Sequence, residues 1–438
     1  MVRRTSWVMA VSVLAVLVPL SSAAQSPTAV APATQTPFDR RAAQLVDVLR
    51  GSLDFSDYFA PSFQTAIPEA QFKAISASLI AQYGQPLRID KATSTDGQSG
   101  TVLLRFEKGV GTIVLDVDTL TDERVTGLRL TGFVVANDSY SQIAAEMAAL
   151  PGKTGFLVAE LGDADMRTLA AANDDVQFAV GSVFKLYVLA ELAAQIEAGQ
   201  RRWSDVVPLS HFSFSSAATA NWPRDTPVTL QTLANWMISV SDNGAADTLI
   251  HLLGRENIEA RMRAAGHSAP SRNIPFLTTV EAFALKGNNF GDVRPLFIAG
   301  DDTVQRRLIA DHRDRLILPN VDGVSFTAGP RFIDSLEWFA SPNDVARLMT
   351  DLRARRAEPV LAAMAINQGV GPVAAADWRY LGYKGGSENG VLSMALLGER
   401  KSDGRWIVVT ASWNNSDANV APEPLIGLVT RLLTLAAK

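Results

Sequence analysis

The chain has 438 residues, of which 47% are apolar and 19% charged, with a formal net charge of −5 and no cysteine. This composition excludes a disordered chain, and the lack of cysteine excludes a thiol nucleophile, a zinc–thiolate site and a disulfide framework. A net negative chain gives no indication of nucleic-acid binding, which needs a basic surface. The length fits two domains. Only nine of the 40 cationic residues are lysines, so a lysine in a patterned position is informative.

Residues 1–24 have the pattern of a cleavable export signal. Two arginines precede an apolar run over residues 7–20 that is too short to span a bilayer, and Ser22 and Ala24 form a small-residue cleavage site. Residues 25–37 are rich in Pro, Ala and Thr and predict a flexible linker. We expect a periplasmic or secreted mature protein without a stable membrane span; an uncleaved anchor is the alternative.

Residues 38–139 predict a small α+β domain. Helical periodicity comes first, and strand-like segments around glycine-containing turns follow. The expected elements are helices at 38–50 and 68–83 and strands at 101–107, 112–117 and 125–135. Helices grouped before an antiparallel sheet are similar to cystatin- or NTF2-like domains. We find no catalytic constellation in this part of the sequence.

Residues 140–438 predict a larger α/β domain in which both ends of the segment pack on one sheet. The expected elements are helices at 141–150 and 422–437 and strands at 155–161, 391–397 and 406–413. Mostly helical sequence lies between the first strand and the last two. This order predicts a sheet covered by helical layers.

The first chemical motif is Ser182-Val183-Phe184-Lys185, which opens an apolar run to Ala198 that predicts a buried helix. A serine at a helix start lies beside free N–H groups, which favour a developing negative charge. Lys185 is about one turn further along the same face. Burial would lower its pKa, so that it could accept the serine proton. The alternative is a capping serine with an incidental lysine.

The second motif is Ser241-Asp242-Asn243, between helical segments at 230–238 and 245–253. Such a cluster commonly caps the following helix, and that is one interpretation. In the other, Ser241 relays a proton to a leaving group and Asn243 holds a substrate amide.

The third motif is Lys384-Gly385-Gly386-Ser387, at the start of the last strand pair. Glycine allows a substrate backbone to approach a strand edge. Lys384 could add a second cation, and the Ser387 N–H could complete an oxyanion hole. The alternative is a surface turn with a solvated lysine.

The three motifs stand in the order S-x-x-K, S-D-N and K-x-G, and with them the chain resembles the class A β-lactamases and penicillin-binding proteins. The resemblance implies a DD-peptidase-like fold over residues 141–438. It also implies catalytic roles for Ser182, Lys185, Ser241 and Lys384 and substrate contacts for Asn243, Gly386 and Ser387. With the preceding α+β domain, the chain is similar to extended β-lactamase-like hydrolases, including a type associated with clavulanic acid biosynthesis.

The chain departs from that family in three places. The loop Arg-x-Glu-Pro-x-x-Asn, whose Glu activates the deacylating water, is missing, and Glu281, Glu337 and Glu388 are the candidate replacements. Gly385 stands where the family has a threonine whose hydroxyl helps to bind a substrate carboxylate. An insertion covers about 288–337. Acylation is therefore expected to be intact, whereas fast lactam hydrolysis does not follow.

The sequence thus predicts an exported serine hydrolase that opens a β-lactam through an acyl-enzyme on Ser182, as a class A β-lactamase does. An esterase, a D-Ala-D-Ala-type peptidase or a slow penicillin-binding sensor are the alternatives. We expect a monomer that acts on a small molecule, with no nucleic-acid partner, no cofactor and no metal.

Overall fold

The computed structural model describes residues 35–438 except 121, 163–164 and 356. The expected export signal and most of the expected linker lie outside the described residues. Thr36 accepts a hydrogen bond from the Asp39 N–H and caps the first helix, which begins at Pro37. Folded structure therefore begins within the last residues of the segment that the sequence assigned to the linker.

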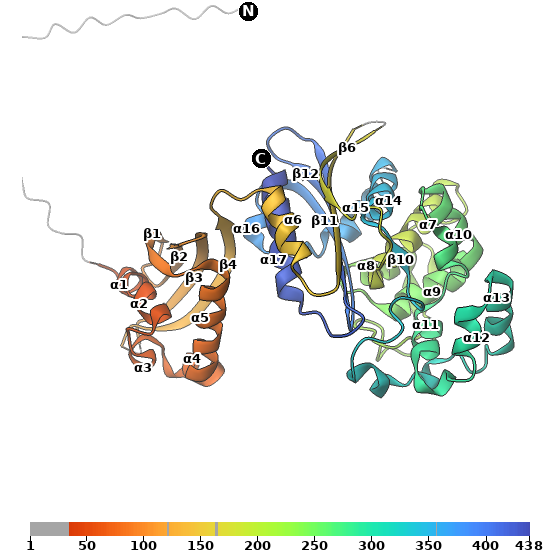
Figure 1. Cartoon of the computed structure of the whole chain (residues 1–438), viewed down its shortest axis with the longest axis horizontal. Helices are drawn as coiled ribbons and strands as arrows, with labels where there is room; N and C mark the ends of the chain where they lie inside the picture. The colour runs from red at the N-terminus through yellow and green to blue at the C-terminus, as the bar shows by residue number, and fades with distance from the viewer. Residues whose placement is uncertain (1–34, 121, 163–164, 356) are drawn as a thin grey trace, which may run out of the picture.

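The amino-terminal part is an α+β unit (Figure 1, red to orange). Its helices are α1 (Pro37–Ala43), α2 (Leu45–Arg50), α3 (Phe55–Tyr58), α4 (Pro61–Ala66) and α5 (Glu69–Tyr83), and its strands are β1 (Pro86–Ser94), β2 (Ser99–Phe106), β3 (Gly109–Asp118) and β4 (Arg124–Val135). The strands form an antiparallel sheet in chain order. Alternate β3 residues are buried because one face of the sheet packs on the helices. The expected helix at 38–50 is broken at Gln44, and β1 was not expected.

The larger part is built on a five-stranded antiparallel sheet with the order β11-β12-β13-β5-β6. The strands are β5 (Lys153–Leu161), β6 (Met166–Ala172), β11 (Trp378–Glu388), β12 (Val391–Arg400) and β13 (Trp406–Asn414). Helices α6 (Tyr140–Ala148) and α17 (Pro422–Ala436) cover one face, so both ends of this part meet on one sheet (Figure 1). The expected α/β fold is confirmed.

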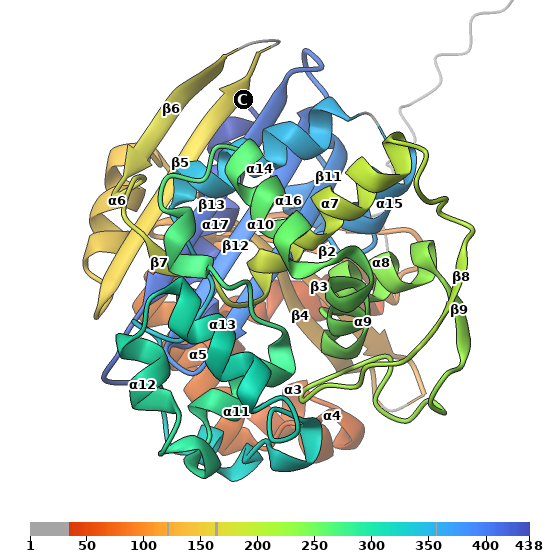
Figure 2. The same ribbon diagram turned by 90° about the vertical axis from the view of Figure 1, so that its right-hand side faces the viewer.

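Helices cover the opposite face of this sheet. They are α7 (Lys185–Glu197), α8 (Leu230–Ser239), α9 (Asn243–Leu253), α10 (Arg255–Ala264), α11 (Thr279–Lys286), α12 (Arg294–Ala299), α13 (Asp302–Asp311), α14 (Pro342–Ala354) and α15 (Glu358–Ala365). The short helix α16 (Pro372–Ala375) instead packs against α17 and β4, on the side of α6. Short strands pair as β7 (Phe178–Ala179) with β10 (Phe339–Ala340) and β8 (Val206–Pro208) with β9 (Pro227–Thr229). The 3₁₀ turns are η1 (Gly181–Phe184), η2 (Pro270–Asn273), η3 (Asn288–Phe290), η4 (Leu318–Asn320) and η5 (Gly323–Thr327). The expected insertion at 288–337 contains α12, α13 and three of these turns, and Figure 2 shows α11, α12 and α13 close together.

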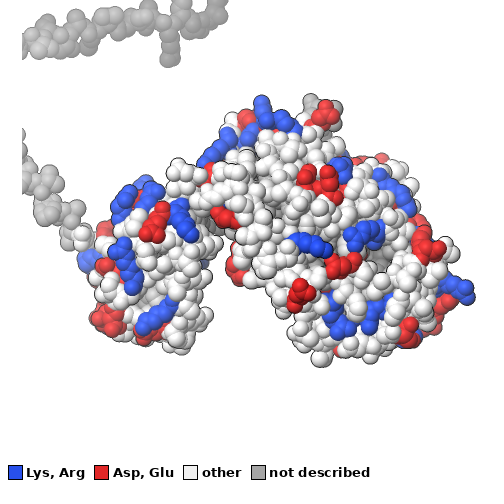
Figure 3. All heavy atoms as spheres, viewed as in Figure 1, with Lys and Arg blue, Asp and Glu red and all other residues white. Residues whose placement is uncertain are grey.

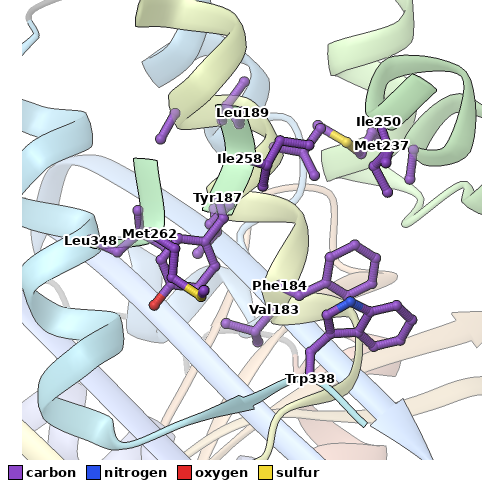
Figure 4. Packing of buried hydrophobic residues seen from close by; sticks show 14 of the residues in the cluster. Val183, Phe184, Tyr187, Leu189, Met237, Ile250, Ile258, Met262, Trp338 and Leu348 are labelled. Atoms are coloured by element: carbon purple, nitrogen blue, oxygen red, sulfur yellow. The ribbon is translucent and has the colours of Figure 1, made fainter. Parts of the chain in front are cut away.

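Helix α7 is the centre of the larger core, as its apolar sequence predicted (Figure 4). Residues 185–193 are all buried. The ring of Phe184, just before the helix, stacks on Trp338 at 3.9 Å between centroids. This packing fixes the start of α7, and with it the direction of the Lys185 side chain.

The face drawn in Figure 3 carries basic and acidic side chains interspersed over both parts of the molecule. It therefore offers no continuous basic surface. Among the described helices, none combines the length and apolar character needed to cross a membrane.

Candidate active site

The three sequence motifs meet at one place in the larger part. Ser182 lies in the 3₁₀ turn η1, and Lys185 is the first residue of α7. Ser241 lies between α8 and α9, and Lys384 lies on β11, the edge strand of the sheet. Residues more than 50 positions apart are thereby joined by side-chain hydrogen bonds. Ser182 was expected at the helix start itself, but α7 begins three residues later because a tighter turn precedes it.

The Lys185 ammonium nitrogen is at the centre of this arrangement. Its Nζ lies 3.1 Å from Ser182 Oγ, 3.2 Å from Ser241 Oγ and 2.6 Å from the Ser241 carbonyl oxygen. The side chain is fully buried. Burial lowers the pKa of Lys185 to about 7, against the attraction of Asp247 and Asp242. Lys185 can therefore be a neutral amine at neutral pH, able to accept a proton from the adjacent serine.

Ser241 joins the two lysines. Its Oγ accepts a hydrogen bond from Lys384 Nζ at 2.9 Å as well as from Lys185. Burial, and then repulsion from Lys185, lowers the pKa of Lys384 well below its usual value. Ser241 has a φ of 59°, which is uncommon for a residue with a side chain. Two lysines with lowered pKa values on one hydroxyl form a connected path for a proton.

Asp242 holds the turn that carries Ser241. It is fully buried, and its carboxylate accepts hydrogen bonds from the N–H groups of Ala218, Thr219 and Ala245. Because the bond from Ala245 caps α9, the helix-cap interpretation applies to Asp242.

Asn243 is held at both ends of its amide. Its Oδ1 accepts from Lys185 at 2.5 Å, and its Nδ2 donates to the Phe214 carbonyl oxygen at 2.8 Å. In this structure the amide thus positions Lys185. Contact with a substrate would require Asn243 to give up one of these bonds.

Gly386 and Ser387 bring the edge of β11 against the turn that carries Ser182. A methyl group on Gly386 would overlap the Val180 carbonyl oxygen and lie 2.7 Å from the Ser182 nitrogen. A methyl group on Gly181, whose φ is 48°, would lie 3.1 Å from the Ser387 nitrogen. Only glycine allows this approach, which brings the backbone nitrogens of Ser182 and Ser387 into the same part of the site. Such a pair of donors is suited to bind an oxyanion.

One segment of the chain matches part of the Arg-x-Glu-Pro-x-x-Asn pattern. Residues 272–278 read Arg-Asn-Ile-Pro-Phe-Leu-Thr, which keeps the spacing of Arg272 and Pro275 in the Arg-x-Glu-Pro-x-x-Asn loop. The Ile274–Pro275 peptide bond is cis. Ile274 stands at the Glu position and is buried. A sequence search for this pattern that allows any residue at the Glu position would have found the segment.

The acidic side chains considered as replacements are occupied by other partners. Glu281 accepts from the Thr278 N–H at 2.8 Å, which forms a capping box at the start of α11, and it pairs with Arg255 at 2.7 Å. Glu337 and Glu388 both pair with the fully buried Lys286, and the two Glu388 contacts are 2.6 and 2.7 Å. None of the three carboxylates is paired with Ser182, Lys185 or Ser241.

Asp247 is a residue that the sequence analysis missed. It lies one turn after Asn243 on α9 and accepts from the N–H groups of Thr279 and Val280, so it caps α11. Burial raises the pKa of Asp247 to about 6. The Asp247 carboxylate attracts the charged form of Lys185, which raises the pKa of that lysine. Its hydrogen bonds connect α9, which follows Ser241, to α11, which follows Ile274. Within the described residues, no three His, Cys, Asp or Glu side chains are grouped so that they could hold a metal.

Comparison with known proteins gives three results. A model described as "Beta-lactamase enzyme family" matches residues 138–367. Among solved structures, the chain is similar to a β-lactamase from Sphaerobacter thermophilus DSM 20745, with 21% identity, 68% of this chain and 97% of that chain covered, and a TM-score of 0.47. It is also similar to an ancestral class A β-lactamase, with 17% identity, 68% of this chain and 99% of that chain covered, and a TM-score of 0.46. The similarity to the protein PBP-A has 14% identity, covers 68% of this chain and 94% of that chain, and has a TM-score of 0.46. No curated protein sequence matches the chain.

Proposed function

Because the chain belongs to the beta-lactamase enzyme family, we propose that it is an exported serine hydrolase that opens β-lactams through an acyl-enzyme on Ser182. The carrying observation is the contact of 3.1 Å between Ser182 Oγ and the buried Lys185 amine. The residues Ser182 and Ser241 are only partly buried, whereas Lys185 and Lys384 are buried. A substrate carbonyl can therefore reach the nucleophile while the base stays dry.

The acylation step follows from these contacts. Neutral Lys185 takes the proton of Ser182, and Ser182 Oγ bonds to the lactam carbonyl carbon. The N–H groups of Ser182 and Ser387 stabilise the resulting oxyanion. When the carbon–nitrogen bond breaks, the leaving nitrogen receives a proton from Ser241, which is replenished by the proton that Lys185 took. The products are an acyl-serine and a ring-opened amine.

Release of the acyl group requires a water molecule, and the residue that activates it in class A β-lactamases is replaced by Ile274. This replacement favours a second candidate function, a slow penicillin-binding sensor that keeps its acyl group. An esterase or a D-Ala-D-Ala-type peptidase would use the same acylation chemistry. We propose a periplasmic or secreted location, on the charged and apolar pattern of residues 1–24.

Incubation with a labelled penicillin tests the proposal. We expect an adduct of one penicillin per chain in the intact mass, which peptide mapping assigns to Ser182. Product formation beyond one equivalent would support the hydrolase, and an adduct that persists for hours would support the sensor. If no adduct forms at Ser182, and Ser182→Ala hydrolyses an acyl ester as fast as the wild type, the proposed function is wrong.

The variant Glu281→Gln distinguishes a structural role of Glu281 from a role in activating the deacylating water. Because Glu281 pairs with Arg255 and caps α11, Glu281→Gln should lower the free energy of unfolding by about 1–3 kcal/mol. We expect the lifetime of the acyl-enzyme, followed by intact mass, to change less than about threefold. A lifetime at least tenfold longer with unchanged acylation would instead identify Glu281 as the base for deacylation.

A further inference from the structure

A cavity of about 560 Å³ lies between the amino-terminal unit and the larger part of the molecule. The amino-terminal unit lines it with the end of α5 and with β4, and the larger part lines it with α6 and α17. In Figure 1, α5 and β4 lie on the side of the unit that faces α16 and α17. Because α6 and α17 cover the sheet face opposite to α7, this cavity is separate from the site at Ser182. Its volume is typical of small-molecule sites in proteins.

Two of the lining residues hold the two parts of the molecule together. Gly132 of β4 packs so closely on α16 that a methyl group on it would lie 2.9 Å from the Val373 side chain. Arg431 of α17 donates to both carboxylate oxygens of Asp138 at 2.7 and 2.8 Å. The cavity is therefore bounded by contacts that the fold itself makes, as is usual for preformed ligand sites.

Apolar side chains form much of the cavity wall. The Tyr83 ring, at the end of α5, stacks on the Phe133 ring of β4 with 3.7 Å between centroids. Leu130, Leu150 and Leu428 add aliphatic surface from both parts of the molecule. An aromatic or aliphatic ligand body would bury apolar surface against these side chains, which is favourable in proportion to the area removed from water.

Lys108 is the lining charge that has no ion-pair partner within the described residues. Its Nζ donates one hydrogen bond of 3.0 Å, to the Gln82 carbonyl oxygen. An ammonium group carries three N–H donors, so Lys108 has two left for a ligand. Arg431 and Glu146 also line the cavity, but they pair with each other, and neither is free for a ligand. The free charge of the cavity is therefore positive, which favours an anionic group.

We propose that this cavity is a second ligand site of the protein, which binds a small organic anion with an apolar body. Lys108 holds the anionic group, and the stacked pair of Tyr83 and Phe133 holds the body. Because such a ligand contacts both parts of the molecule, its binding also stabilises their arrangement. The proposal is independent of the acyl-enzyme chemistry, since none of these residues belongs to the site at Ser182.

Fluorescence titration of the full chain with 8-anilinonaphthalene-1-sulfonate, an aromatic anion whose emission rises in apolar surroundings, tests the site. We expect saturable binding of about one equivalent by the wild type. Gly427→Leu is the blocking variant, because a methyl group on Gly427 would meet only the Gln82 side chain, at 3.7 Å. The leucine extends into the cavity that Gly427 lines and should weaken binding at least about tenfold. Since leucine forms helices better than glycine, the melting temperature without ligand should not fall.

Two lysine variants test the class of ligand, because they remove the same charge from the same unit. Lys91 is exposed on β1 and does not line the cavity, so Lys91→Gln should leave the affinity unchanged. Lys108→Gln should weaken binding of the sulfonate about two- to fivefold, the usual contribution of an exposed ion pair. The neutral probe N-phenyl-1-naphthylamine lacks the sulfonate. Its affinity should therefore not respond to Lys108→Gln, but it should still fall in Gly427→Leu.

The site itself is wrong if the wild type does not bind the sulfonate saturably, or if Gly427→Leu binds it as tightly as the wild type. The assignment of the ligand as an anion held by Lys108 is wrong if Lys108→Gln and Lys91→Gln have equal effects. It is also wrong if Lys108→Gln weakens both probes equally.

Discussion

Replacing Lys185 with methionine is expected to slow acylation of Ser182 by about 10²- to 10⁴-fold, the usual contribution of a positioned general base. Methionine fills a similar volume in the same apolar surroundings, so the packing around α7 is retained. What is lost is the amine 3.1 Å from Ser182 Oγ. The measurement is the rate of penicillin adduct formation by intact mass, with the free energy of unfolding as a check on folding.

The pH dependence of acylation gives this prediction a second readout. Lys185 acts as a base only when neutral, and burial lowers its pKa to about 7. The wild-type rate should therefore level off above pH 7 and fall about tenfold per unit below it. Lys185→Met should show no inflection near pH 7. A wild-type rate that is constant from pH 5 to 8, or a variant with less than about a threefold loss, would contradict the role of Lys185 as the base.

Replacing Lys286 with methionine is expected to lower the free energy of unfolding by about 3–5 kcal/mol at a pH where both of its partners are ionised, because the buried Glu337 and the largely buried Glu388 then have no counter-charge. Lys286 Nζ contacts Glu337 and both carboxylate oxygens of Glu388, and its side chain is 1% exposed. Although burial opposes the charged form, the two carboxylates raise the pKa of Lys286. The cluster connects the end of α11, the end of the insertion and the end of β11.

Charge removal at the partners provides the control for this prediction. The triple variant Lys286→Met, Glu337→Gln, Glu388→Gln has no unpaired charge at the cluster and should recover most of the lost stability. Urea unfolding followed by tryptophan fluorescence measures both variants, since Trp338 follows Glu337 directly. A loss below about 1 kcal/mol for Lys286→Met, or a triple variant less stable than the single one, would contradict the charge argument.

The burial of Glu388 also affects the pH dependence of stability. Burial, opposed by Lys286 and assisted by the Glu337 charge, raises the pKa of Glu388 well above its usual value. In the folded protein Glu388 thus keeps its proton at a pH where the unfolded chain has lost it. Stability from this group is complete below the unfolded pKa and is lost as the pH rises through the folded pKa. Glu388→Gln removes that dependence.

The sequence by itself was enough to predict which residues meet at the site. Ser182 and Lys185 are recognisable because a helical spacing of three brings two side chains onto one face, whatever surrounds the helix. The order of the three motifs indicated the family, and the family fixed the α/β fold. Apolar patterning gave β12, β13 and the buried helix α7, because a fully covered element needs an apolar sequence. These signals are local, so one segment is enough to read them.

Only the tertiary structure decided what each candidate contacts. Lys286 and Glu388 are 102 positions apart, and nothing in either segment indicates that they pair. The sequence offered Glu281, Glu337 and Glu388 as candidate bases, but it did not show that Glu281 pairs with Arg255 and that the other two pair with Lys286. The physical reason is that the burial and the ion pairs of these side chains arise between segments far apart in the sequence. Burial and ion pairing in turn set the pKa values of the lysines and carboxylates.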